Sequence, residues 1–115
     1  MPPESAMVQR TLEMLVLKSL SLAPMHGWGI AQRIDQLSSG TFQVQQGSLY
    51  PALLRMKRAG WVKTEWRKTG NNRRARYYQL TAAGRKQLDV EATNWQKASE
   101  AVNAFLRTTR LEGSV

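Results

Sequence analysis

The segment from Ala82 to Arg107 constrains the fold most, because it reads as one helix too long for a chain of 115 residues to cover by itself. Thr81 can cap its start. One face carries Leu88, Trp95 and Val102, which are seven positions apart. The same face carries Ala92, Ser99 and Leu106, each of which follows one of these by four positions. This narrow seam has the 3.5-residue period of paired helices. It predicts a dimer interface.

A helix predicted from Thr11 to Leu22 supports the same expectation. Leu12, Leu15 and Ser19 share one face, and Val16, Leu20, Met14 and Leu17 extend the apolar surface around the cylinder. A helix this apolar is usually buried on most sides, whereas one small domain covers one face. We therefore expect a second chain to cover Leu12 and Leu15. Residues 1–8, which have no periodicity, are predicted to be a flexible tail, and 108–115 a frayed one.

Two shorter helices are predicted between these segments. The first spans 28–37 with the core stripe Ile30, Ile34 and Leu37, and residues 42–45 alternate like a very short strand. The second spans 48–59, with Gly47 or Ser48 as its cap and Pro51 in or near its first turn. Its predicted buried stripe is Leu49, Leu53 and Met56.

Two aromatic, alternating stretches at 61–66 and 76–80 predict a β-hairpin with a long basic tip at 67–75. Trp61 and Trp66 are expected to pack in the core and the hairpin, and Asn71 and Asn72 to make the turn more readily than to contact bases. The fold class is therefore mainly α with a small β-hairpin. It is a winged helix-turn-helix over 9–80, followed by a dimerisation helix over 81–107.

The charge pattern points to nucleic acid. The chain carries a formal charge of +9, and 11 basic residues between Arg55 and Lys86 are opposed there by Glu65 alone. The remainder of the chain is slightly acidic. Such a basic block, rich in arginine, is the footprint of a surface that faces DNA phosphates, although it would also suit a solvated surface.

Composition argues against other classes. With no cysteine and one histidine, the chain lacks thiol chemistry and a multi-histidine metal site, and its acids are scattered. His26 is interpreted as a turn or phosphate-side residue, since no carboxylate partners it in sequence. We expect no enzyme activity, cofactor or metal. Met1 to Arg10 has no signal-peptide apolar region and the longest apolar run is Met14–Leu17, so we expect a cytoplasmic protein without a membrane partner.

Four motifs resemble the PadR family of transcriptional regulators, over roughly residues 10–107. They are Leu12-Glu13-Met14-Leu15-Val16-Leu17, Met25-His26-Gly27-Trp28-Gly29-Ile30, Gln46-Gly47-Ser48-Leu49-Tyr50-Pro51-Ala52-Leu53, and Arg76-Tyr77-Tyr78-Gln79-Leu80-Thr81-Ala82-Ala83-Gly84. The single C-terminal helix resembles the short subfamily. The resemblance implies a homodimeric repressor that binds double-stranded operator DNA and is released by a small, often aromatic, effector.

The resemblance also implies site residues. Gln46, Ser48, Tyr50, Pro51 and Arg55 match the recognition-helix region, and Asn72, Arg73, Arg74 and Arg76 match the wing, to which charge adds Lys68. Tyr50 either touches DNA or packs against the wing. Trp28 stands where the family usually has tyrosine, so its indole N–H is expected to replace the hydroxyl beside His26 at the phosphate. Trp95 is either dimer packing or a platform for an aromatic ligand, with Met14 as a second ligand candidate.

Two alternatives stay open at this point. One is a small-molecule sensor of the multidrug type, whose main role is ligand binding at the dimer interface. The other is an architectural protein that binds nucleic acid without sequence preference, which would show steep salt dependence and little discrimination.

Overall fold

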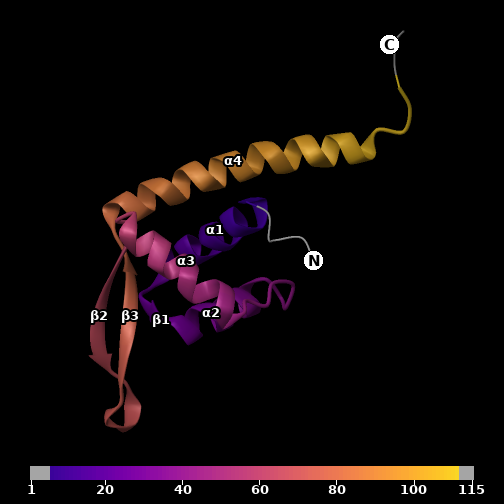
Figure 1. Ribbon diagram of the computed structural model, residues 1–115. Helices are drawn as coiled ribbons and strands as arrows, with labels where there is room; N and C mark the ends of the chain where they lie inside the picture. The colour runs from indigo at the N-terminus through magenta and orange to yellow at the C-terminus, as the bar shows by residue number, and fades with distance from the viewer. Residues whose placement is uncertain (1–5, 112–115) are drawn as a thin grey trace.

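The computed structural model describes residues 6–111. Its elements are α1 (Ala6–Leu22), β1 (Met25–His26), α2 (Gly27–Leu37), α3 (Gln46–Arg58), β2 (Val62–Lys68), a 3-10 turn (Gly70–Asn72), β3 (Arg74–Leu80) and α4 (Ala82–Arg107). In Figure 1 the β2–β3 hairpin projects from the helical body, α1 lies along α4, and the outer half of α4 extends away from the rest. The predicted class, mainly helical with a small antiparallel sheet and a long last helix, is confirmed.

The sheet contains a strand that the sequence pattern did not predict. β1 pairs antiparallel with β3, and β3 pairs with β2 from Val62 opposite Leu80 to Lys68 opposite Arg74, which gives the order β1-β3-β2. The strand expected at 42–45 is wrong, because these residues have no strand partner. The edge of β3 that a third strand can occupy is taken by Met25 and His26.

The helix boundaries correct several expectations. α1 begins at Ala6, so 6–8 belong to a helix rather than to a flexible tail, and 1–5 lie outside the described residues. α3 begins at Gln46 after Gln45, whose side chain makes no cap bond, so neither Gly47 nor Ser48 is the cap. α4 spans the predicted range. Residues 108–111 after it are not helical, and 112–115 are not described.

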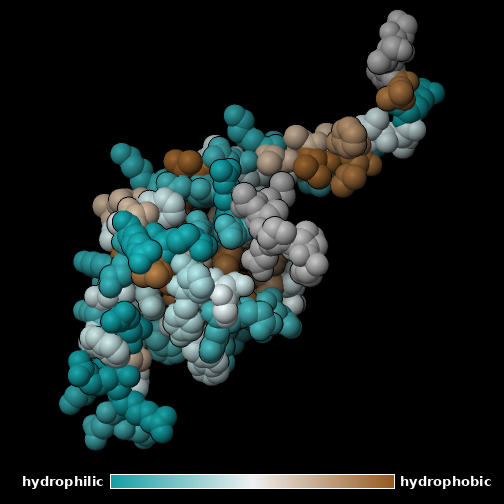
Figure 2. All heavy atoms as spheres, in the orientation of Figure 1, coloured by the Kyte–Doolittle hydropathy of each residue, from teal (hydrophilic) through white to brown (hydrophobic). Residues whose placement is uncertain are grey.

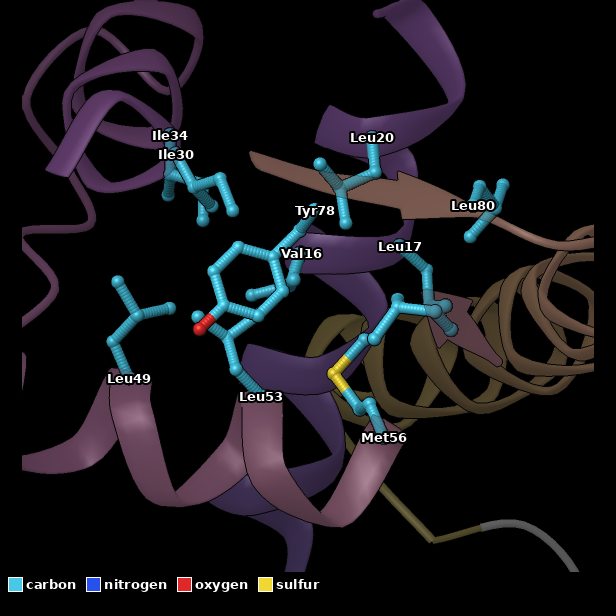
Figure 3. Close-up of a cluster of buried hydrophobic side chains, with 11 residues drawn as sticks. Val16, Leu17, Leu20, Ile30, Ile34, Leu49, Leu53, Met56, Tyr78 and Leu80 are labelled. Carbon is cyan, nitrogen blue, oxygen red and sulfur yellow. The ribbon is translucent and has the colours of Figure 1, made fainter. Parts of the chain in front are cut away.

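The core lies where the helices meet the base of the sheet (Figure 3). It is built from buried residues of three helices and two strands: Val16, Leu17 and Leu20; Ile30 and Ile34; Leu49, Leu53 and Met56; Val62, Tyr78 and Leu80. The predicted stripe of α3 is confirmed. Leu37 is 66% exposed and not a core residue, because α2 ends there, one turn beyond the last buried position, Ile34.

A close backbone contact joins the hairpin to α4. The Thr81 hydroxyl accepts the N–H of Gly84 (3.0 Å) and donates to the Gly60 carbonyl (2.6 Å), while the Thr81 N–H donates to the Trp61 carbonyl (3.0 Å). Gly84 is buried here, and a Cβ at this position would collide with the Trp61 carbonyl oxygen. Glycine in the first turn of α4 therefore permits this close approach.

Candidate nucleic-acid interface

Helix α3 turns one face to the core and leaves the other free. Leu49, Ala52, Leu53 and Met56 are buried. The predicted recognition residues lie on the remaining surface, where Ser48 is half-buried and the others are exposed: Gln46, Tyr50, Pro51 and Arg55. The structure thus leaves this predicted group on the part of α3 that is not packed against the core.

The backbone at the start of α3 is only partly bonded, with the N–H groups of Ser48 and Leu49 donating to the Gln45 carbonyl (3.1 and 2.9 Å). The first N–H groups of a helix have no partner within it and favour anions. Pro51 is the sixth residue of α3, near the first turn as expected. Because proline has no N–H, it cannot donate to the Gly47 carbonyl one turn earlier. The first two N–H groups of α3, those of Gln46 and Gly47, therefore have no partner inside the helix, and the Gly47 carbonyl receives no bond from residue 51.

Tyr50 packs against the start of α2 and also interacts with Tyr78 of the wing strand β3. Its ring covers Gly27, where an added Cβ would lie only 2.6 Å from the Tyr50 hydroxyl oxygen. The ring is nevertheless 44% exposed. Glycine at position 27 makes room for the ring, which links the start of α2 to the exposed face of α3.

His26 organises the first turn of α2. Its Nδ1 accepts the N–H of Gly29 (3.0 Å), so the neutral ring carries its proton on Nε2. The ring stacks near Trp28 (6.4 Å between centroids) and meets Tyr77 edge-on (5.5 Å). Trp28 is exposed, and its ring lies beside that of His26 at the start of α2. The two residues predicted to contact a phosphate therefore lie together.

Arg55 is engaged inside the chain. Its Nε donates to Glu13 Oε2 at 3.1 Å, and its Nη2 lies 3.1 Å from the same oxygen. The pair connects the exposed face of α3 to α1 across 42 positions of sequence. Sequence reasoning assigned Arg55 to DNA and missed Glu13, for which no local pattern gave a signal.

The hairpin has two faces, set by the alternation of its side chains. The inner face begins with the buried Val62 and Leu80 and continues outward, beyond the core, through four exposed residues: Trp66, Lys68, Arg74 and Arg76. The outer face carries Arg67, which donates from Nε to Glu65 Oε1 (2.8 Å) and lies 4.9 Å from the centre of the Tyr77 ring. We name the set Trp66, Lys68, Arg74 and Arg76 the cationic wing face.

Trp66, which is expected to pack in the core and the hairpin, packs within the hairpin alone, because it lies one step beyond the end of the core. It is 54% exposed, whereas Trp61 at the base of the hairpin is half-buried against the core. The guanidinium carbons of Arg76 and Arg74 lie 5.2 and 5.4 Å from the centre of its ring. Both distances fall within the range of a cation–π contact.

The tip of the hairpin is held in a fixed turn. Asn71 and Asn72 both have positive φ angles (67° and 60°), so the predicted turn role is confirmed. The Thr69 N–H donates to the Arg73 carbonyl (2.6 Å) and closes the loop. The hydrophilic side chains gathered on the projecting hairpin are visible at the lower end of Figure 2. The predicted wing residues Asn72 and Arg73 lie at this tip.

The cationic wing face places like charges opposite each other. Lys68 and Arg74 form a directly paired cross-strand position. Like charges in such a pair destabilise a sheet. Within residues 6–111, neither side chain has an ion pair with a carboxylate. The arrangement therefore favours an anionic partner from outside the chain.

A shallow groove lies between α1 and α4. Its volume is about 330 Å³, and it brings Met14 together with Trp95, the two residues expected at a ligand site. The other lining residues had not been predicted: Arg10, Thr11, Glu91, Asn94 and Ala98. No sequence signal marked them, because the groove arises from how the two helices cross.

The predicted dimer residues fall into two groups. Leu12, Leu15 and Leu88 are half-buried against the chain's own core, and Ala92 and Ser99 are half-buried as well. Trp95, Val102 and Leu106 are exposed, and Phe105, which the seam did not include, is 80% exposed. Figure 2 shows this hydrophobic surface on the outer half of α4. The apolar side chains there lie beyond the reach of the folded body.

Residues 6–111 contain no cluster of three or more histidine, cysteine or acidic side chains that could hold a metal ion.

Across the same residues, none of the helices is both long and apolar enough to cross a bilayer.

Known proteins share this arrangement. The model of the PadR-like family of transcriptional regulators matches residues 16–90. A PadR-like transcriptional regulator from Bacillus cereus is 26% identical, with a TM-score of 0.78 over 91% of this chain and 100% of that one. A transcriptional regulator from Clostridium thermocellum is 20% identical, with a TM-score of 0.80 over 90% of this chain and 100% of that one.

A further relative, an uncharacterized protein from Lysinibacillus sphaericus, is 20% identical over 89% of this chain and 94% of its own length. The family model covers more than half of the chain and includes α2, α3 and the hairpin. The chain therefore belongs to the PadR-like family of transcriptional regulators.

Proposed function

We propose that the chain is a repressor that binds an inverted-repeat DNA operator as a homodimer. The observation that carries the proposal is the cationic wing face, on which Arg74 and Lys68 oppose each other without an acidic partner among the described residues. Phosphate oxygens supply the missing negative charge, and arginine matches their geometry. The wing contacts the backbone or minor groove of a duplex.

Helix α3 reads sequence in this proposal. The major groove admits one α-helix, and residues near the start of such a helix contact base edges. Gln46, Ser48 and Tyr50 occupy these positions, and the start of α2 with His26 and Trp28 contacts a phosphate. Base contacts specify the site, whereas phosphate contacts position the protein.

The homodimer rests on α4. Val102, Phe105 and Leu106 leave apolar surface exposed on the outer half of the helix, which a second α4 and α1 would cover. A two-fold axis then sets two α3 helices against half-sites about one helical turn, or 10–10.5 base pairs, apart.

A salt titration on a fluorescent mixed-sequence duplex tests the proposal. Each lost phosphate contact lowers the magnitude of the slope of log affinity against log salt by about 0.9. Arg74→Ala removes one contact from each protomer of the homodimer, so a fourfold rise in salt weakens the wild type about 12-fold more than Arg74→Ala. Lys97→Ala removes an exposed cation from α4 and serves as the matched control. An unchanged slope in Arg74→Ala, or no binding by the wild type, contradicts the proposal.

Specificity needs a second comparison. Ser48→Ala is expected to change which duplexes bind best, because Ser48 lies on the reading face, while Arg74→Ala weakens all duplexes alike. Equal affinity of the wild type for every duplex would favour the architectural alternative.

The groove between α1 and α4 supports a second function, the binding of a planar aromatic effector. Its volume of about 330 Å³ lies within the range of small-molecule sites, and Trp95 is 46% exposed beside Met14. Proflavine, a planar aromatic dye, is expected to quench tryptophan fluorescence in the wild type and in Trp61→Phe but not in Trp95→Phe. The dye must also weaken DNA binding, and DNA must weaken dye binding by the same factor. Equal quenching in both variants contradicts this assignment.

A further inference from the structure

Trp66 lies at the centre of the cationic wing face without belonging to the core. Arg76 faces it directly across the strands, and Arg74 lies two residues earlier on β3, opposite Lys68. Both guanidinium groups lie over the same indole ring, at 5.2 and 5.4 Å from its centre. One exposed aromatic ring thus holds two arginines of the hairpin.

On the opposite face of the hairpin the arginine has a carboxylate partner. Arg67 is bound by Glu65 and covers Tyr77, so a carboxylate compensates its charge. Among the described residues, Arg74 and Arg76 have no such carboxylate. An aromatic ring orders a guanidinium group without neutralising it. The two faces therefore differ in net charge while both keep their arginines in place.

We propose that Trp66 is a positioning residue for DNA binding, whose ring holds Arg74 and Arg76 in place on the wing face before the duplex arrives. The inference rests on the proposed DNA-binding function. A free arginine loses side-chain freedom when it binds a phosphate, whereas an arginine already held on a ring loses less. Trp66 adds affinity in this way without adding a phosphate contact.

A double-mutant cycle on the full chain distinguishes positioning from direct contact. The probe is a mixed-sequence duplex about three helical turns long. Trp66→Thr, which keeps strand propensity, is expected to weaken binding roughly fivefold with an unchanged salt slope, since the number of phosphate contacts stays the same. In the Arg74→Ala, Arg76→Ala background the same change is expected to have no effect. Trp66→Tyr, which keeps an aromatic ring, should restore most of the affinity.

Proton NMR of the free protein gives a readout that does not need DNA. The side-chain CH₂ protons of Arg74 and Arg76 should be shifted upfield by the indole ring in the wild type and should move to ordinary positions in Trp66→Thr. A thermal melt of each variant checks its fold, and Trp66→Val, which keeps strand propensity without a ring, replaces Trp66→Thr if the latter fails to fold.

Three results would overturn the proposal. The first is a wild type in which the side-chain CH₂ protons of Arg74 and Arg76 have ordinary chemical shifts. The second is a Trp66→Thr change that weakens DNA binding as much in the Arg74→Ala, Arg76→Ala background as in the wild type. The third is a Trp66→Thr variant that binds DNA as tightly as the wild type. The second would show that Trp66 itself contacts DNA. Failure of the wild type to bind any duplex refutes the proposed function instead, and the ring-current shifts still report on whether Trp66 orders the arginines.

Discussion

Replacing Gly84 with alanine should destabilise the protein, although alanine is the better helix former. In an open helix interior the change would stabilise by roughly 0.8–1.0 kcal/mol, and by less in the first turn. At Gly84 the new methyl group meets the Trp61 carbonyl oxygen, a backbone atom that also accepts the Thr81 N–H, and lies 2.6 Å from Leu80 Cδ1. Overpacking of this kind typically costs about 1–3 kcal/mol. The net expectation is a loss of about 1–2 kcal/mol.

Gly47→Ala is the matched control, because it makes the same chemical change in a helix where no atom lies within 4 Å of the added Cβ. It should leave stability unchanged or raise it. Thermal unfolding at one fixed protein concentration measures both variants, and each kcal/mol corresponds to roughly 4–8 °C in a domain of this size. A Gly84→Ala variant as stable as the wild type would refute the close contact between the hairpin and α4.

Further predictions concern the ion pair, the dimer and alkaline pH. Glu13→Gln should lower the free energy of unfolding by less than about 1 kcal/mol, because its ion pair with Arg55 is partly exposed. The same change releases Arg55 and should therefore strengthen duplex binding at low salt. Weaker binding would show that Glu13 instead holds Arg55 in its binding position. Val102→Asp should shift the solution mass measured by light scattering from dimer to monomer, whereas Asn103→Asp, one residue away on the same helix, should not; a dimeric Val102→Asp would rule out the predicted seam. Burial raises the pKa of Tyr78 above 10.0, against the lowering influence of Arg76. The unfolded chain then releases the phenol proton before the folded chain does, so the free energy of unfolding should fall above about pH 10 more steeply in the wild type than in Tyr78→Phe; parallel urea-unfolding curves of the two proteins at pH 8 and pH 11 would contradict this.

Long periodic segments were predictable from the sequence, whereas short pairings were not. The range of α4 and the buried stripe of α3 follow from spacing and capping alone. β1 consists of two residues, which is too short for any alternation to show. Likewise, the first five residues of α1 show no apolar period in the sequence. They are helical as an extension of the periodic segment that begins at Thr11.

The candidate site shows the same division. Side-chain parity assigns Trp66 to the inner face of the hairpin, but parity does not say where the core ends. The sequence therefore predicts packing in both the core and the hairpin, and Trp66 packs in the hairpin only. The Arg55–Glu13 pair and the groove around Trp95 depend on how distant helices cross. Such contacts are tertiary, and a single sequence contains no local signal for them.

Selection of bound duplexes from a random pool tests the central claim most directly. If two copies of α3 and of the cationic wing face engage one duplex through a two-fold axis, the selected sequences should share an inverted repeat with half-sites about 10–10.5 base pairs apart. Recovery of an unenriched pool, or of a motif without two-fold symmetry, would contradict the account.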